Sequence, residues 1–209
     1  NATKQWDVSV SIPFVFECNG VNDNERLSNL VKDFYNSATL ADNANLKVVI
    51  KGRLGVTNKK LYGSGTYADN YRVFEFGVSG YSGNRRVFLD FSGAEVPEIN
   101  TIVEGYNYYT IIDNLNIPIS IYGLSIIARQ TRMQGMSGSG AYLTCFKGNG
   151  YTLTDCNISS LNESWNGSYA VSGENNTFNN CSFTVKGSNA VSYAITGNKA
   201  KVVNCKFNS

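Results

Sequence analysis

The heptapeptide TFNNCSF at residues 177–183 returns as KVVNCKF at residues 201–207, and TLTDCNI at residues 152–158 is a third version of it. The three copies align without a gap from a glycine to a cysteine, and the cysteines lie 25 and then 24 residues apart. Self-similarity at a fixed period of this length is typical of proteins built from stacked structural repeats. We therefore take this repeat as the basis for predicting the fold.

Each column of the alignment keeps one chemical type. The columns are Gly148, Gly173 and Gly197; Leu153, Phe178 and Val202; Asp155, Asn180 and Asn204; Cys156, Cys181 and Cys205; and Ile158, Phe183 and Phe207. Apolar residues alternate with polar ones around each cysteine, which indicates short β-strands. We predict an all-β fold, a right-handed parallel β-helix or solenoid whose turns stack about 4.8 Å apart. The cysteines would then form an inward ladder, and the Asp/Asn column a side-chain ladder at a bend.

The rest of the chain fits this repeat more loosely. Further strands are expected at residues 46–50, 72–76, 86–91, 110–117 and 119–127. Leu115 or Leu124 would take the place of the cysteine, and a Gly/Ser-rich insertion, GMSGSG, follows at residues 135–140. An antiparallel sandwich is the competing architecture, because its short strands and frequent turns give a similar pattern. The gap-free repeat favours the β-helix.

The N-terminal segment contains the one clear helix pattern. Leu27, Leu30, Val31 and Phe34 are spaced to form one apolar face over residues 24–36, and Asn22 with Glu25 predicts a capping box. An amphipathic helix of this kind is the expected cover for the end of a β-solenoid. We assign residues 1–44 to a strand and capping helix and residues 45–209 to the stack, which we expect to continue, or to be covered by another chain, beyond Ser209.

Composition limits the possible chemistry. The chain contains no histidine and carries a formal net charge of only +2, so we expect no imidazole catalysis, no nucleic-acid partner, no metal site and no cofactor. No run of residues approaches the roughly 20 apolar positions that span a bilayer, so no membrane partner is expected. The five cysteines are expected to be free thiols, and those of the column to be buried, because in-register side chains rarely meet disulfide torsions. A hydroxyl in place of Cys181 would find few free acceptors.

Aromatic residues in polar surroundings are the main surface signal. They are Tyr106, Tyr108, Tyr109, Tyr142, Trp165 and Tyr169. Such rings either stack on sugars or pack against a neighbouring subunit. Arg129 and Arg132 are candidates for binding anionic groups of a glycan. The acidic residues Asp90, Glu95, Glu98, Glu104, Asp113 and Glu163 could supply a carboxylate pair for glycoside hydrolysis or lyase chemistry, but none stands in a recognisable motif.

The segment FECNGVNDN at residues 16–24, a strand followed by a Gly-containing turn and a short helix, resembles the start of the pectate-lyase-like β-helix in phage tail spikes and preneck appendage proteins. The resemblance implies a virion-borne, extracellular homotrimer that contacts other virion proteins and binds host cell-surface polysaccharide. It equally allows a polysaccharide-degrading enzyme on the same fold. No catalytic motif of the family can be matched residue by residue, so the catalytic residues stay unknown.

Overall fold

A computed structural model describes residues 11–56, 60–62, 70–103, 108–132, 142–163, 167–187 and 192–209. One helix, α1 (Asp23–Asn36), accompanies three β-sheets. Sheet A contains β1 (Ser11–Glu17), β2 (Asn45–Arg53), β5 (Arg86–Glu95), β8 (Ile119–Tyr122), β11 (Thr152–Thr154), β14 (Thr177–Asn179) and β17 (Lys201–Val203). Sheet B contains β3 (Lys60–Tyr62), β4 (Asn70–Glu75), β7 (Tyr108–Asp113), β10 (Leu143–Lys147), β13 (Ser168–Ser172) and β16 (Tyr193–Thr196). Sheet C contains β6 (Ile99–Val103), β9 (Ser125–Arg132), β12 (Asn157–Asn162), β15 (Ser182–Gly187) and β18 (Lys206–Asn208).

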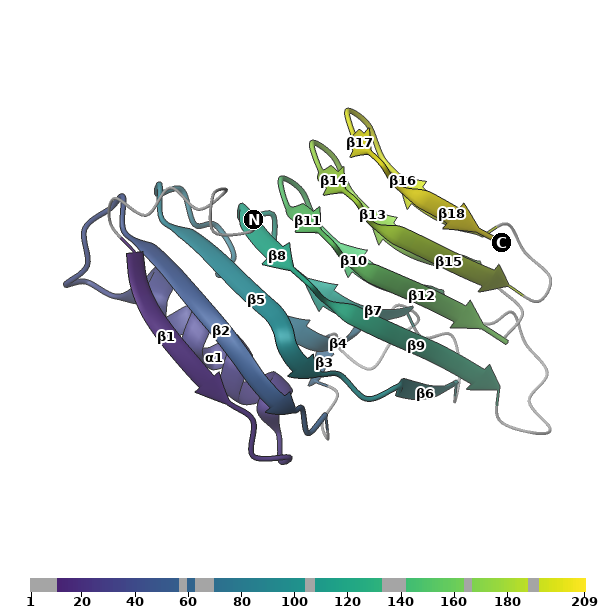
Figure 1. The fold of residues 1–209 in the computed structure, drawn as a ribbon, viewed down its shortest axis with the longest axis horizontal. Coiled ribbons are helices and arrows are strands. Elements are labelled where there is room, and N and C mark those ends of the chain that lie inside the picture. Colours follow the sequence, from purple (N-terminus) through teal and green to yellow (C-terminus); the bar gives the residue numbers. More distant parts are fainter. Residues whose placement is uncertain are drawn as a thin grey trace.

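The chain visits the sheets in a fixed order. From β7 onward it places successive strands in sheets B, A and C, and then repeats this sequence through β18 (Figure 1). All strand pairs in the described part are parallel, except that β3 pairs antiparallel with β4. Leu153 pairs with Phe178, and Phe178 with Val202, so the sequence period is also the step from one strand to its neighbour. The all-β prediction and the predicted alignment of the copies are confirmed.

The glycine column forms the bend between sheets B and A. Gly148, Gly173 and Gly197 all have φ between 125° and 134°, a backbone region that side chains disfavour. A Cβ atom on Gly173 would stand 1.8 Å from the carbonyl oxygen of Gly148, and one on Gly197 would stand 1.9 Å from that of Gly173. Stacked backbone therefore leaves no room for a side chain at Gly173 and Gly197, and the Asn114 side chain fills the corresponding space at Gly148.

The Asp/Asn column forms the bend between sheets A and C. Asp155, Asn180 and Asn204 have φ between 51° and 55°, which Asp and Asn tolerate better than other non-glycine residues. The Asn180 amide donates to the Asp155 carboxylate, as the predicted side-chain ladder requires. Gly123 takes the same place one strand earlier, with φ of 68°. Leu124, rather than Leu115, therefore takes the place of the cysteine.

Apolar side chains from the three sheets and α1 form one core. Cys156 and Cys181 are buried in it as free thiols, as predicted, whereas Cys205 in the last repeat is partly exposed. The Cys181 thiol donates to the carbonyls of Asn179 at 3.3 Å and Leu153 at 3.5 Å. The Asn179 carbonyl also accepts the Asp155 N–H at 3.0 Å, so this acceptor is already engaged by the backbone, as expected for the column.

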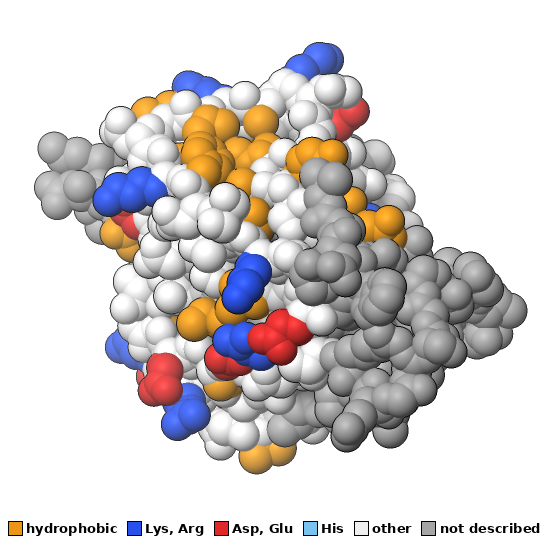
Figure 2. Space-filling model, turned by 90° about the vertical axis from the view of Figure 1, so that its right-hand side faces the viewer, with side chains coloured by type: hydrophobic (Ala, Val, Ile, Leu, Met, Phe, Trp, Pro, Cys, Tyr) orange, Lys and Arg blue, Asp and Glu red, His pale blue; other side chains and the backbone are white. Residues whose placement is uncertain are grey.

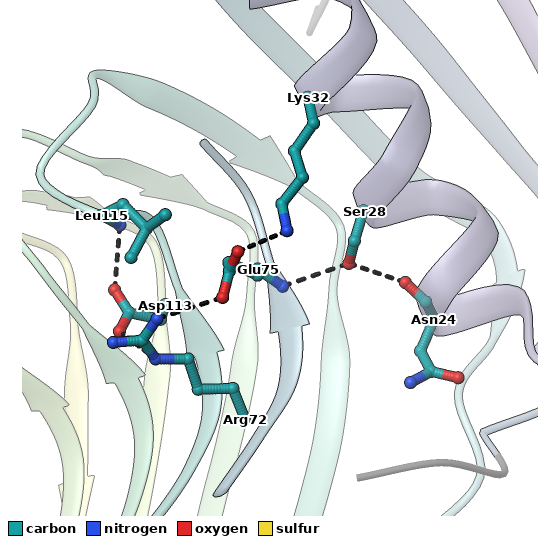
Figure 3. A network of polar contacts seen from close by, with 7 residues as sticks. All are labelled: Asn24, Ser28, Lys32, Arg72, Glu75, Asp113 and Leu115. Carbon is teal, nitrogen blue, oxygen red and sulfur yellow. Dashed lines mark hydrogen bonds and ion pairs between the residues drawn. The ribbon is translucent and has the colours of Figure 1, made fainter. Parts of the chain in front are cut away.

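Helix α1 lies beside β4 and satisfies part of its edge. The Asn24 amide donates to the Val73 carbonyl at 2.9 Å, and the Glu75 N–H donates to the Ser28 hydroxyl at 3.1 Å. Lys32, one turn further along the helix, pairs with the Glu75 carboxylate. Figure 3 shows these three helical side chains facing the strand. The helix thereby provides hydrogen-bond partners that another strand would otherwise supply.

The start of α1 differs from the predicted capping box. Asn22 has left-handed backbone, with φ of 49°, and makes no side-chain cap, because a capping side chain needs an extended backbone at that position. Asp23, the first residue of the helix, binds the turn before it instead. Its buried carboxylate accepts N–H groups of Asn19 at 3.2 Å, Gly20 at 2.9 Å and Gly55 at 2.8 Å. The carboxylate joins the turn before the helix to the loop after β2.

Arg85 joins the other end of α1 to the stack. Its guanidinium is buried and donates to five backbone carbonyls, those of Phe34, Tyr35, Ser37, Leu40 and Ala41, at 2.6–3.2 Å. The last carbonyls of a helix lack partners within the helix and carry its partial negative charge. A buried cation at this position satisfies both requirements. Among the described residues, no helix is long and apolar enough to cross a membrane.

Candidate functional site

The outer face of sheet B carries a strip of tyrosine rings. Tyr169 on β13 and Tyr193 on β16 are paired in register, with parallel rings whose centroids lie 5.8 Å apart. The ring of Tyr142, just before β10, lies 5.8 Å from that of Tyr169. The neighbouring Ala170 is buried, so strand alternation directs the tyrosines outward. Tyr193 is the most exposed of the three, at 45%. We call Tyr142, Tyr169 and Tyr193 the tyrosine strip.

A network of charges lies on the same sheet toward the N-terminal end. The Arg72 guanidinium donates to Glu75 at 3.0 Å and to Asp113 at 2.9 Å, and Lys32 of α1 completes the network (Figure 3). Both acidic residues are buried, and the Asp113 carboxylate also accepts the Leu115 N–H at 2.9 Å. Because each carboxylate already has a cation partner, the network holds α1, β4 and β7 together and offers little free charge to a ligand.

Sheet C brings together three residues that sequence reasoning proposed separately. Arg129 on β9 donates from Nε to Glu98 at 2.7 Å and from a terminal nitrogen to Glu163 at 2.5 Å. Their side chains are between one-third and one-half exposed. The two glutamates raise the pKa of Arg129 through hydrogen bonding and charge. The cluster has one cation and two carboxylates, so Arg129 is poorly placed to attract an anionic glycan.

The other predicted site residues divide into two groups. Tyr106 and Trp165, with Glu104, lie outside the described residues, and Tyr108 belongs to β7 although its side chain is not among those described. Asp90 accepts from the Ser92 N–H and hydroxyl, and Glu95 pairs weakly with Arg53 at 3.5 Å on an exposed surface. Neither of these two carboxylates joins the tyrosine strip.

Sequence reasoning missed Tyr193 as a surface aromatic. The signal was present, because Tyr169-Ala170-Val171 and Tyr193-Ala194-Ile195 occupy equal positions in adjacent repeats. In a parallel stack, equal positions lie side by side, so a repeated outward tyrosine predicts a pair of neighbouring rings.

Cys18 and Cys145 offer no nucleophile at neutral pH. Burial raises the pKa of Cys145 to about 12, and burial together with the Asp23 charge raises that of Cys18 to about 11. The thiolate is the reactive form of cysteine, so both side chains stay inert. Within the described part of the chain, no cluster of three acidic or cysteine residues is arranged to hold a metal ion.

One open groove of about 550 Å³ lies far from the tyrosine strip, between β1 and α1. Phe14, Phe16 and Leu30 line it together with the charged Glu17 and Arg26. Strand β1 is at the opposite end of the stack from β16 and β17 (Figure 1). The groove therefore does not extend the tyrosine strip.

Comparison of the chain with models of known protein families, with curated proteins and with solved structures gives no match.

Proposed function

We propose that the chain is a right-handed parallel β-helix with an N-terminal helical cap. Its support is the order B, A, C in which strands enter the three sheets, together with in-register pairing at a step of 24 or 25 residues. Connections between parallel strands of one sheet are right-handed in about 98% of cases. A chain that repeats such connections in one direction winds as a right-handed helix.

We further propose that this β-helix is a structural and host-receptor-binding module of a phage tail spike or preneck appendage, which binds cell-surface glycan outside the host. The resemblance of residues 16–24 to the start of such proteins supports the class. The described succession of β1, a tight turn, α1 and stacked strands agrees with that resemblance. Fold alone does not identify function, so the binding role rests on the surface groups.

The observation that carries the binding role is the tyrosine strip. Three neighbouring rings on one sheet face present apolar faces or edges with hydroxyl groups beside them, as the amphipathic surface of a sugar requires. The strands beneath are fixed by parallel ladders on both sides of β13, so the rings need little ordering on binding. A glycan would lie against Tyr169 and Tyr193, crossing β13 and β16.

A retention assay tests this proposal directly. The chain is incubated with host cell-wall or capsular polysaccharide, and the bound fraction of the wild type is compared with those of Tyr193→Ala and Tyr122→Ala. Tyr122 on β8 is a matched control, because it lies on sheet A, away from the strip. We expect Tyr193→Ala to weaken retention about threefold to tenfold and Tyr122→Ala to leave it unchanged. Equal behaviour of the two variants would contradict the assignment.

A polysaccharide-degrading lyase or hydrolase is the second candidate, and the Glu98–Arg129–Glu163 cluster is what favours it. Sharing one guanidinium keeps the two carboxylates within the roughly 9.5 Å limit of glycoside hydrolases. A catalytic acid, however, needs surroundings that keep it protonated, such as burial without a cation nearby. Both glutamates are partly exposed and share a cation, so binding is the better-supported function. New reducing or unsaturated ends that vanish in Glu163→Gln would reverse this preference.

We also propose that the chain associates as a homotrimer and contacts other virion proteins. Its support is the exposed apolar side chains of the last repeat outside the tyrosine strip, Val202, Val203 and Phe207, at 40–50% exposure. Viewed toward this end, the surface shows hydrophobic side chains gathered into a patch (Figure 2). Contiguous apolar surface of this kind marks contacts with other chains or ligands.

A further inference from the structure

Lys147 lies between the charge network and the tyrosine strip on the outer face of sheet B. It ends β10, is exposed, and pairs in register with Asp113 on β7 and Ser172 on β13. Toward the C-terminal end of the stack, the residues in register with Lys147 are uncharged: Ser172 on β13 and then Thr196 on β16. Lys147 is therefore the last charged residue before the tyrosines.

The charges around this face leave Lys147 uncompensated. Glu75 and Asp113 are engaged by Lys32 and Arg72, as described above. Lys147 forms no ion pair with any described residue, and the exposed Glu174, two residues after Ser172, accepts from the Asn198 amide at 3.2 Å, which leaves the Lys147 charge without a paired carboxylate. That charge is located on a flexible, exposed ammonium group, which can bind carboxylate or phosphate without breaking an internal pair.

The spacing suits a ligand that reaches both Lys147 and the strip. Thr144 pairs with Tyr169, and Lys147 is three residues further along β10, or about 10 Å. A disaccharide spans this distance. A sugar held against Tyr169 and Tyr193 would therefore place the following sugar within reach of the ammonium group.

Arg129 is the alternative anion-binding residue, and the structure disfavours it. Its guanidinium is occupied by Glu98 and Glu163 on sheet C, where two carboxylates outweigh one cation. An anionic ligand would have to displace a glutamate there, whereas at Lys147 it would meet an unpaired charge.

We propose that Lys147 makes the outer face of sheet B selective for acidic glycan. Its ammonium group binds a carboxylate or phosphate on the sugar that follows the one held by the tyrosine strip. This inference rests on the proposed function and names the ligand class of the same site.

The test uses the polysaccharide that the wild-type chain retains, in three forms: untreated, with its carboxyl groups reduced to alcohols, and with its phosphate groups removed. Loss of binding in the second or third form identifies carboxylate or phosphate as the anion. We expect the relevant treatment to weaken wild-type binding about twofold to fivefold at low ionic strength, as for an exposed charge pair. We expect Lys147→Gln to bind the treated and untreated forms alike.

The variants separate failure of this inference from failure of the proposed function. Lys186→Gln is the matched control, because Lys186 is an exposed lysine on β15 of sheet C. Tyr193→Ala should weaken binding of all three forms equally. If Lys147→Gln retains wild-type preference for the untreated form while Tyr193→Ala loses binding, the inference fails and the proposed function stands. If the wild type retains no polysaccharide, or Tyr193→Ala binds normally, the proposed function fails and the inference with it.

Discussion

Two buried tyrosines differ by a single hydrogen bond. The Tyr151 ring packs between Phe146 and Phe178, and its hydroxyl has no partner among the described residues. The Tyr35 hydroxyl donates to the Pro118 carbonyl at 3.3 Å. Burial raises the pKa of both groups, so both stay neutral at any pH the fold tolerates. The two residues therefore isolate the cost of an unsatisfied hydroxyl in this core.

Tyr151→Phe should leave the free energy of unfolding unchanged or raise it by up to about 1 kcal/mol, because it removes a buried group without a partner. Tyr35→Phe should lower it by about 1 kcal/mol, because it leaves a carbonyl without its donor. Urea unfolding of the two variants measures both values. Destabilisation by Tyr151→Phe comparable to that by Tyr35→Phe would show that the Tyr151 hydroxyl has a partner in the folded protein.

Asp23 should make stability depend on pH. Burial alone would raise its pKa, but N–H groups of Gly55, Asn19 and Gly20 and the Arg26 side chain lower it below its ordinary value. A lowered folded-state pKa contributes stability above the unfolded pKa of about 3.9, and this stability disappears as pH falls through the folded value.

Asp23→Asn places an amide NH2 against backbone N–H groups, and should cost about 2 kcal/mol at neutral pH. The thermal midpoints of the wild type and Asp23→Asn should converge as the pH falls below about 4. Asp33→Asn, at an exposed position of the same helix, is the control and should have little effect at either pH. A constant difference across this pH range would exclude the ionised Asp23 carboxylate as the stabilising group.

At the level of elements, α1 depends on Arg85 for its attachment to the stack. Arg85→Met removes the donor of five carbonyls and should lower the free energy of unfolding by about 3 kcal/mol, as for lost hydrogen bonds to a charged group. Arg86→Met, at the exposed neighbour that begins β5, should change it by less than about 0.5 kcal/mol. Urea denaturation gives the free energy of unfolding of both variants. Equal losses would show that water satisfies the five carbonyls when the Arg85 guanidinium is removed.

The cysteine column gives a second test at this level. Cys181→Ser keeps a donor near the carbonyls of Asn179 and Leu153, so we expect a cost of about 1 kcal/mol from lost packing and a longer bond. Cys205→Ser, in the same bend but partly exposed, should cost less. The thermal unfolding midpoints of the two variants rank these two stability costs. A larger loss for Cys205→Ser would mean that burial does not set the cost in this column.

The sequence predicted the elements whose local chemistry repeats, and missed those whose partners are distant. The glycine and Asp/Asn columns were visible because a left-handed backbone restricts residue type at every turn. The capping box at Asn22 was wrong because its motif does not reveal the backbone angle of the capping residue. Arg85 was missed because backbone carbonyls, which every residue carries, are its only acceptors among the described residues.

The candidate site was predictable only in part, for the same reason. Tyr142 and Arg129 were identified from their polar surroundings, but a single position does not show its neighbours across the stack. Glu98 and Glu163 lie 31 and 34 residues from Arg129, a spacing that exceeds the 24-residue period of the clearest repeats. Without the register of sheet C, their meeting at one guanidinium could not be foreseen.

At the scale of the whole molecule, we expect association in solution. The exposed apolar side chains of β17 and β18, Val202, Val203 and Phe207, would be covered in a homotrimer or by another virion protein. Sedimentation at micromolar concentration should give a species of three times the 22.9 kDa chain mass. A species with the mass of one chain at that concentration would contradict the proposed homotrimer.

We propose that one face of a stacked parallel fold, the outer face of sheet B, holds glycan. A crystal structure of the chain, soaked with the shortest oligosaccharide that blocks retention on host polysaccharide, tests it most directly. We predict density for sugar rings against Tyr169 and Tyr193, crossing β13 and β16, with an acidic group beside Lys147. Density on sheet A, or around the Glu98–Arg129–Glu163 cluster of sheet C with the tyrosine strip empty, would contradict it.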